Sequence, residues 1–70
     1  MLTKKQFTNK LAKKIRQIRK KKGMSQEELA HEAGLYRTYV GHIEKGRYSP
    51  SAFVLYKVSM ALKARLKDFF

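Results

Sequence analysis

The 70-residue chain contains no cysteine and no tryptophan, and it has only one proline and five acidic residues. The lack of cysteine excludes disulfide bonds, thiol nucleophiles and cysteine-based zinc or iron–sulfur sites. The longest apolar run, residues 52–56, is far shorter than the about 20 residues that a membrane-spanning helix needs. No apolar segment with a cleavage site follows the basic N-terminus, so we expect no signal peptide and a cytoplasmic location.

The charge of the chain is strongly one-sided. Lys and Arg number 17 against the five Asp and Glu, which gives a formal net charge of +12 at pH 7. This excess favours an acidic polymer as the partner, with nucleic acid ahead of an anionic membrane. The length allows one domain over residues 1–70, and the hydrophobic content of 43% is enough for a core. A separate catalytic cleft has little room in such a domain.

Residues 1–22 carry more than half of the positive charge and no acid. Apolar side chains recur there at spacings of four, four and three, on one stripe of an α-helix: Phe7, Leu11, Ile15 and Ile18. Thr3 or Thr8 would cap this helix, and Gly23 suits the left-handed position that ends it. We interpret most of the lysines as a solvated face and a few as phosphate contacts.

Two short helices are expected over residues 25–45. Ser25 and Glu28 have the spacing of a capping box, and Gly34 ends the helix that they begin. A second helix follows over about 36–45. Two short helices joined by a tight glycine-containing turn are typical of a helix-turn-helix. The pattern that supports this motif is Gln26, Leu29, Ala30, Gly34, Leu35, Val40, Ile43, Glu44 and Gly46.

The last part of the chain predicts two more helices. Ser49 is a good N-cap and Pro50 suits the first helical position, so we expect a helix over 50–62. A short fifth helix is expected over 65–70, with Leu66 and Phe69 pointing inward. No segment alternates with a period of two. The fold class that we predict is therefore all-α, a compact five-helix bundle.

The segment SQEELAHEAGLYRTYVGHIEKGRYSPS, residues 25–51, resembles the central block of the phage-repressor and Cro-like helix-turn-helix regulators, which have the lambda-repressor-like fold. Residues 54–70 are similar to the last two helices of that family. Residues 37–46 look most similar to the controller proteins of restriction–modification systems. The resemblance implies a sequence-specific, double-stranded-DNA-binding transcriptional regulator of bacterial or phage origin, associated with the nucleoid. We also expect a roughly palindromic operator, bound as a homodimer for a reason given below, and no cofactor.

The resemblance also implies roles for particular residues, with helix 36–45 in the major groove. The base contacts would come from Tyr36, Arg37, Thr38 and His42. Arg37 can pair bidentately with guanine, and Thr38 can donate, accept or touch a thymine methyl group. The phosphate contacts would come from Gln26, Tyr39, Lys45, Arg47 and Ser49.

An internal ion pair between Arg19 and Glu44 is a further implication of the resemblance, and a surface pair is the alternative. Three residues depart from the family pattern. Gly41 lies within the recognition helix, either through simple tolerance or to let the backbone approach the groove. Lys63 replaces the Gly that often ends the fourth helix, and Tyr36 is large where a small polar residue is usual.

The helix over 50–62 has a second apolar stripe, formed by Phe53, Tyr56 and Met60. It either covers the fifth helix or forms a two-fold homodimer interface, to which Phe70 would add. We favour the dimer, because two-fold symmetry places two recognition helices about 34 Å apart, on successive major-groove faces.

Other classes of function remain as alternatives. The charge also fits a non-sequence-specific module for RNA or single strands, and the motif fits the DNA-binding antitoxin or controller of a toxin–antitoxin or restriction–modification system. A membrane-active cationic helix would leave most of the chain unexplained. His31 and His42 stand 11 residues apart without a third ligand, so we expect no metal site and no enzyme. We expect no small-molecule ligand either.

Overall fold

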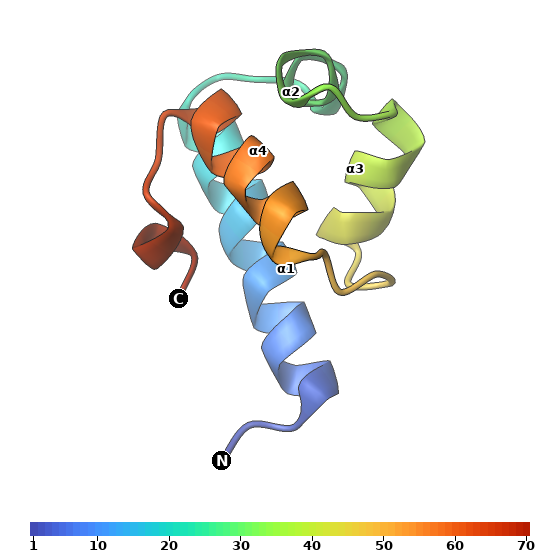
Figure 1. The fold of residues 1–70 in the computed structure, drawn as a ribbon, viewed down its shortest axis with the longest axis vertical. Helices are drawn as coiled ribbons and strands as arrows, with labels where there is room; N and C mark the ends of the chain where they lie inside the picture. The colour runs from blue at the N-terminus through green and yellow to red at the C-terminus, as the bar shows by residue number, and fades with distance from the viewer.

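The computed structural model describes residues 1–70, which form four α-helices and one short 3-10 helix. The α-helices are α1 (Lys4–Lys21), α2 (Gln26–Ala33), α3 (Arg37–Glu44) and α4 (Ala52–Leu62), and the 3-10 helix is η1 (Leu66–Phe69). Figure 1 shows α1 and α4 in the middle of the molecule, with α3 on one side of them and η1 on the other. The all-α prediction is confirmed. None of the helices combines the length and apolar character that crossing a membrane requires.

One hydrophobic core holds the helices together. Every element contributes to its buried side chains, which are Leu11, Ile15, Leu29, Ala30, Val40, Ile43, Val58, Leu62 and Phe69. The stripe predicted for the first helix is confirmed at Leu11 and Ile15, and Ile18 packs beside them. Phe7 is an exception, because it lies beyond the end of this core and stacks on Phe70 with ring centroids 5.5 Å apart.

Local capping explains where the first two helices begin. The Thr3 hydroxyl accepts from the Gln6 backbone N–H, and the Ser25 hydroxyl accepts from the Glu28 backbone N–H. The Ser25 backbone N–H donates back to the Glu28 carboxylate and lowers the pKa of that carboxyl, with the Ser25 hydroxyl adding to the effect. The Glu28 carboxylate therefore stabilises α2 fully at pH values above its ordinary pKa. This contribution is lost as the pH falls through the lowered pKa of Glu28.

The predicted start of the fourth helix is wrong by two residues. Ser51, not Ser49, is its N-cap, and its hydroxyl accepts from the Val54 backbone N–H at 3.2 Å. Pro50 consequently lies in the preceding loop rather than in the first turn of the helix. Both serines offer the same capping group, so the path of the loop between α3 and α4 decides which of them is used.

The prediction of a fifth α-helix over 65–70 is also wrong. This segment forms only the four-residue η1, with a short-range bond from the Asp68 N–H to the Arg65 carbonyl oxygen at 2.9 Å. One such turn is too short to be an α-helix, and it is sufficient to bury Phe69 completely. Leu66, which was expected to point inward, is exposed.

Candidate nucleic-acid interface

The turn between α2 and α3 sets the direction of α3. Gly34 adopts the left-handed conformation with φ of 67°, and the Leu35 N–H donates to the Ala30 carbonyl oxygen at 2.8 Å. Val40 and Ile43 on the inner face of α3 are buried in the core. Because these contacts hold one face of α3, its first turn projects from the molecule.

The exposed first turn of α3 contains the predicted base-reading residues. Tyr36 is the N-cap residue; its side chain makes no capping bond and is 83% exposed. Arg37 and Thr38 follow at the first two helical positions and are also exposed. A guanidinium group and a hydroxyl on a projecting helix end are able to reach the edges of base pairs in a major groove.

His42 lies apart from these three residues, one turn further along α3. It is half-buried, with its Nδ1 atom 3.4 Å from the Arg47 guanidinium and its ring 5.0 Å from that of Tyr48. The Tyr48 ring in turn lies 5.5 Å from that of Tyr39. The structure therefore groups His42 with the predicted phosphate contacts Tyr39 and Arg47. Sequence reasoning missed Tyr48, whose only signal was its place in the loop directly after α3.

A buried ion pair holds the C-terminal end of α3 against α1. Arg19 donates from Nε to Glu44 Oε2 at 2.7 Å and from Nη2 to Glu44 Oε1 at 2.9 Å, with side-chain exposures of 9% and 1%. Arg19 Nη1 also donates to the Met24 carbonyl oxygen at 2.7 Å. Gln26, predicted to contact a phosphate, donates from Nε2 to Glu44 Oε1 at 3.1 Å. This network ties α1, α2 and α3 together.

The loop after α3 presents the remaining candidate residues. Lys45, Arg47 and Ser49 are all exposed. Gly46 has φ of 74° and packs against Asn9 of α1 so closely that a Cβ atom would collide with the Asn9 side chain. This close approach of α1 to the loop was not predicted, because no local pattern connects Asn9 with Gly46.

Negative charge is nearly absent from this surface. Glu44 is the only acid in residues 36–49, and it is buried and paired with Arg19. The exposed part of this segment therefore carries no carboxylate that would repel a phosphate backbone. A projecting helix end with donor groups, a tight glycine turn and an uncompensated positive rim together define a helix-turn-helix DNA-binding domain.

Comparison with known proteins agrees with this class. The helix-turn-helix family model matches residues 15–69, so the chain belongs to that family. It is 44% identical over 57 residues to an uncharacterized HTH-type transcriptional regulator of Archaeoglobus fulgidus, covering 81% of each chain. It is 48% identical over 56 residues to control protein C.BamHI of Bacillus amyloliquefaciens, covering 79% of this chain and 69% of the relative.

A solved structure shares the whole architecture. The restriction–modification controller protein C.AhdI from Aeromonas hydrophila superposes with a TM-score of 0.88 at 36% identity, over 90% of this chain and 96% of the other. The predicted resemblance to helix-turn-helix regulators is thus confirmed, and the chain is a DNA-binding transcriptional regulator. These relatives are regulators rather than enzymes, consistent with the expectation of a non-enzymatic protein.

Proposed function

We propose that the protein represses or activates transcription by binding a roughly palindromic operator as a homodimer, in the cytoplasm, where the DNA lies. The single observation that carries the proposal is the projecting first turn of α3, with Arg37 and Thr38 exposed and Val40 and Ile43 anchored in the core behind it. In this arrangement α3 enters the major groove, and Tyr36, Arg37 and Thr38 contact base edges.

The residues around this helix end take the phosphates. Lys45, Arg47 and Ser49 follow α3 in the loop and are exposed on its rim. Gln26 keeps one amide N–H beyond its bond to Glu44, and this N–H is the group that it offers to a phosphate. His42 reaches the DNA beside Arg47, with which it is in contact.

Selection of bound sites from random duplex DNA tests the proposal. We expect an enriched palindrome with half-sites centred about 10 base pairs apart, and binding at least about 10³-fold tighter than to random duplex. Equal affinity for all duplexes, or preference for RNA or single strands, would contradict it and favour a non-specific nucleic-acid module.

A dimer interface is supported by the outer face of α4. Phe53, Tyr56 and Met60 are 68%, 51% and 62% exposed, and η1 does not cover them. Three large apolar side chains on one helix face are costly to leave in water, and a second copy related by a two-fold axis would bury them. Phe70, which was also assigned to this interface, stacks on Phe7 of α1, and its part in a dimer stays a prediction.

Met60→Lys is expected to convert the dimer into a monomer and to weaken operator binding, because it places a charge within the stripe that the dimer would bury. Leu66→Lys is the matched control, since it adds the same charge at an exposed apolar position outside the stripe. Sedimentation at micromolar concentration, with and without operator DNA, measures both effects. A wild-type protein that stays monomeric on its operator would refute the interface.

Lys45→Ala is expected to weaken binding to every sequence alike and to reduce the slope of log affinity against log salt by about one. The physical reason is the loss of one phosphate contact and of the counterion release that accompanies it. Lys67→Ala on η1, on the far side of the molecule from α3, is the control and should leave the slope unchanged. Binding isotherms at several salt concentrations distinguish the two.

The similarity to C.BamHI and C.AhdI favours a more particular role as the controller of a restriction–modification system. In that case the selected operator should occur in front of restriction or methyltransferase genes in the source genome. Operators found only in front of unrelated genes would exclude this role and leave the general proposal intact.

A further inference from the structure

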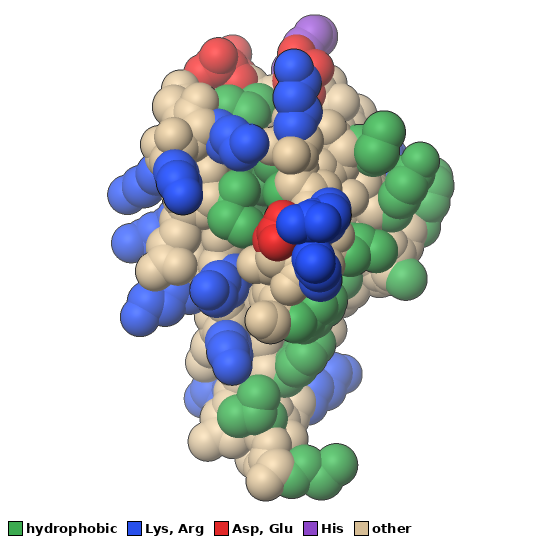
Figure 2. Space-filling view, turned by 90° about the vertical axis from the view of Figure 1, so that its left-hand side faces the viewer, with side chains coloured by type: hydrophobic (Ala, Val, Ile, Leu, Met, Phe, Trp, Pro, Cys, Tyr) green, Lys and Arg blue, Asp and Glu red, His purple; other side chains and the backbone are tan.

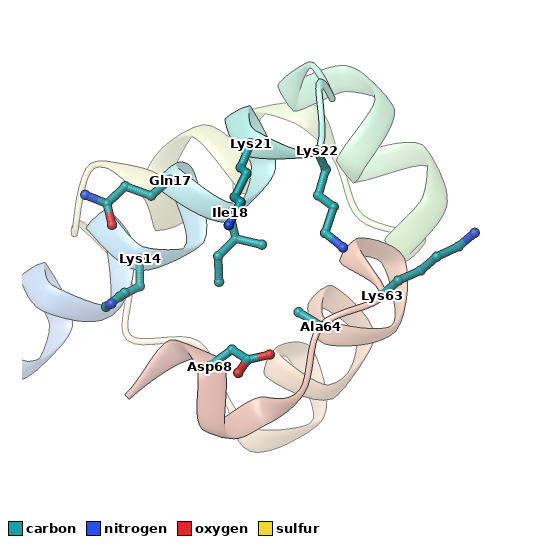
Figure 3. Close-up of a pocket in the computed structure, with 8 residues that line it drawn as sticks. All are labelled: Lys14, Gln17, Ile18, Lys21, Lys22, Lys63, Ala64 and Asp68. Carbon is teal, nitrogen blue, oxygen red and sulfur yellow. The ribbon is translucent and has the colours of Figure 1, made fainter.

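A basic hollow of about 580 Å³ lies between the C-terminal half of α1 and the turn that follows α4 (Figure 3). Its lining consists of Lys14, Gln17, Ile18, Lys21, Lys22, Lys63, Ala64 and Asp68. In Figure 1 this region, next to η1, is on the opposite side of α1 and α4 from α3. The hollow is therefore separate from the surface assigned to operator DNA.

The positive charge around the hollow has no partner within the protein. Four of the eight lining residues are lysines, and Asp68 is the only acid among them. Asp68 already accepts the Arg65 backbone N–H at 2.9 Å, and the single ion pair of the molecule is that between Arg19 and Glu44. Figure 2 shows Lys and Arg side chains gathered over much of this side of the molecule. The lysines outnumber the acid four to one, and such an excess of positive charge attracts anions.

Lys63, at one end of the hollow, ends α4 in the left-handed conformation. It is the only non-glycine residue with a positive φ, at 54°, whereas the other residues with positive φ are Gly23, Gly34 and Gly46. The turn requires only its backbone, because the Lys63 N–H donates to the Met60 carbonyl oxygen at 3.2 Å. Glycine would form the same turn without strain. Lysine in place of glycine at this helix end adds one positive charge to the rim of the hollow.

The hollow combines positive charge with a small apolar surface. Ile18 and Ala64 supply apolar surface, and Lys21 and Lys22 point toward the hollow (Figure 3). Lys14 and Lys63 stand at its two ends with their ammonium groups turned outward, and the Asp68 carboxylate lies at its edge. The volume falls within the range of about 300–1,000 Å³ that small-molecule sites occupy. Lysine ammonium groups bind phosphates, and the apolar patch suits the face of a ring. We propose that this hollow binds a small, multiply phosphorylated ligand of the nucleoside polyphosphate class.

Amide NMR spectra of the full chain, titrated with ATP, test the proposal. We expect saturable shifts at Ile18, Lys21, Lys22 and Ala64, and weaker binding of either tripolyphosphate or adenosine alone, because each lacks one half of the recognised chemistry. The double variant Lys21→Gln/Lys22→Gln should bind ATP about tenfold more weakly through the loss of two charged contacts.

The matched control is Lys4→Gln/Lys5→Gln, which removes the same charge from the other end of α1 and should change the ATP affinity less than about twofold, since screening reduces distant charge effects. Equal weakening in both variants, or shifts that do not saturate or extend evenly to α3, would overturn the proposal in favour of diffuse charge attraction. Non-operator duplex DNA and polyglutamate are added as competitors at the same charge concentration. If either one reverses the ATP-induced shifts, the hollow binds a macromolecule and the proposal is overturned as well.

Discussion

Arg19→Met is expected to lower the free energy of unfolding by about 3–5 kcal/mol. The substitution leaves the Glu44 carboxylate, 1% exposed in the native protein, with only the Gln26 amide as a hydrogen-bond partner. It also frees the Met24 carbonyl oxygen that Arg19 holds at 2.7 Å. Domains are stable by only about 5–15 kcal/mol in total, so a large part of the stability should disappear. Urea denaturation followed by circular dichroism measures the loss.

The control for this prediction replaces both partners. Arg19→Met/Glu44→Leu removes the buried charge together with its counterion, and apolar side chains of similar volume often substitute for such a pair without loss. We therefore expect the double variant to be more stable than Arg19→Met alone. A loss below about 1 kcal/mol in the single variant would show that the pair behaves like an ordinary surface ion pair.

Arg37→Ala is expected to relax the preference for one base pair of each half-site and to cost about 1–3 kcal/mol of operator binding. The guanidinium group on the first turn of α3 is exposed and makes no bond within the protein, so stability should hardly change. Binding to the selected operator and to its single-base variants, at one fixed salt concentration, measures the effect on specificity.

Arg37→Lys separates the contribution of base recognition to binding from that of positive charge. Lysine keeps the positive charge and loses the planar fork that pairs with two acceptors of guanine. We expect affinity for random duplex to persist in this variant and the base preference to weaken. If Arg37→Ala left the base preference untouched, α3 would not be the reading helix, and the proposed function would lose its main support.

Much of the fold could be predicted because the signals are local. Ser25 and Glu28 cap α2 with bonds that span three residues, and Gly34 ends it in a left-handed conformation, so a short stretch of sequence determines both ends. Apolar spacing on α1 likewise identified Leu11 and Ile15 as core residues. The end of the chain was predicted wrongly because its local signal is weak. Four residues contain too little pattern to distinguish a 3-10 turn from an α-helix.

The details of the site required the tertiary structure. His42 contacts Arg47 and Tyr48, and Gly46 lies against Asn9. No periodicity in the sequence connects these residues. Such contacts form only when separate helices are packed, so neither spacing nor composition determines them.

The sequence by itself determined the helix-turn-helix, the projecting residues Arg37 and Thr38, and the excess of positive charge, because helix caps, turns and net charge depend on near neighbours or on composition. Only the tertiary structure decided how that charge is divided. It gathered lysines from residues 14–22 and Lys63 around one hollow, on the side remote from α3. The physical reason is that the distance between charged side chains far apart in the chain depends on how the helices pack against the common core.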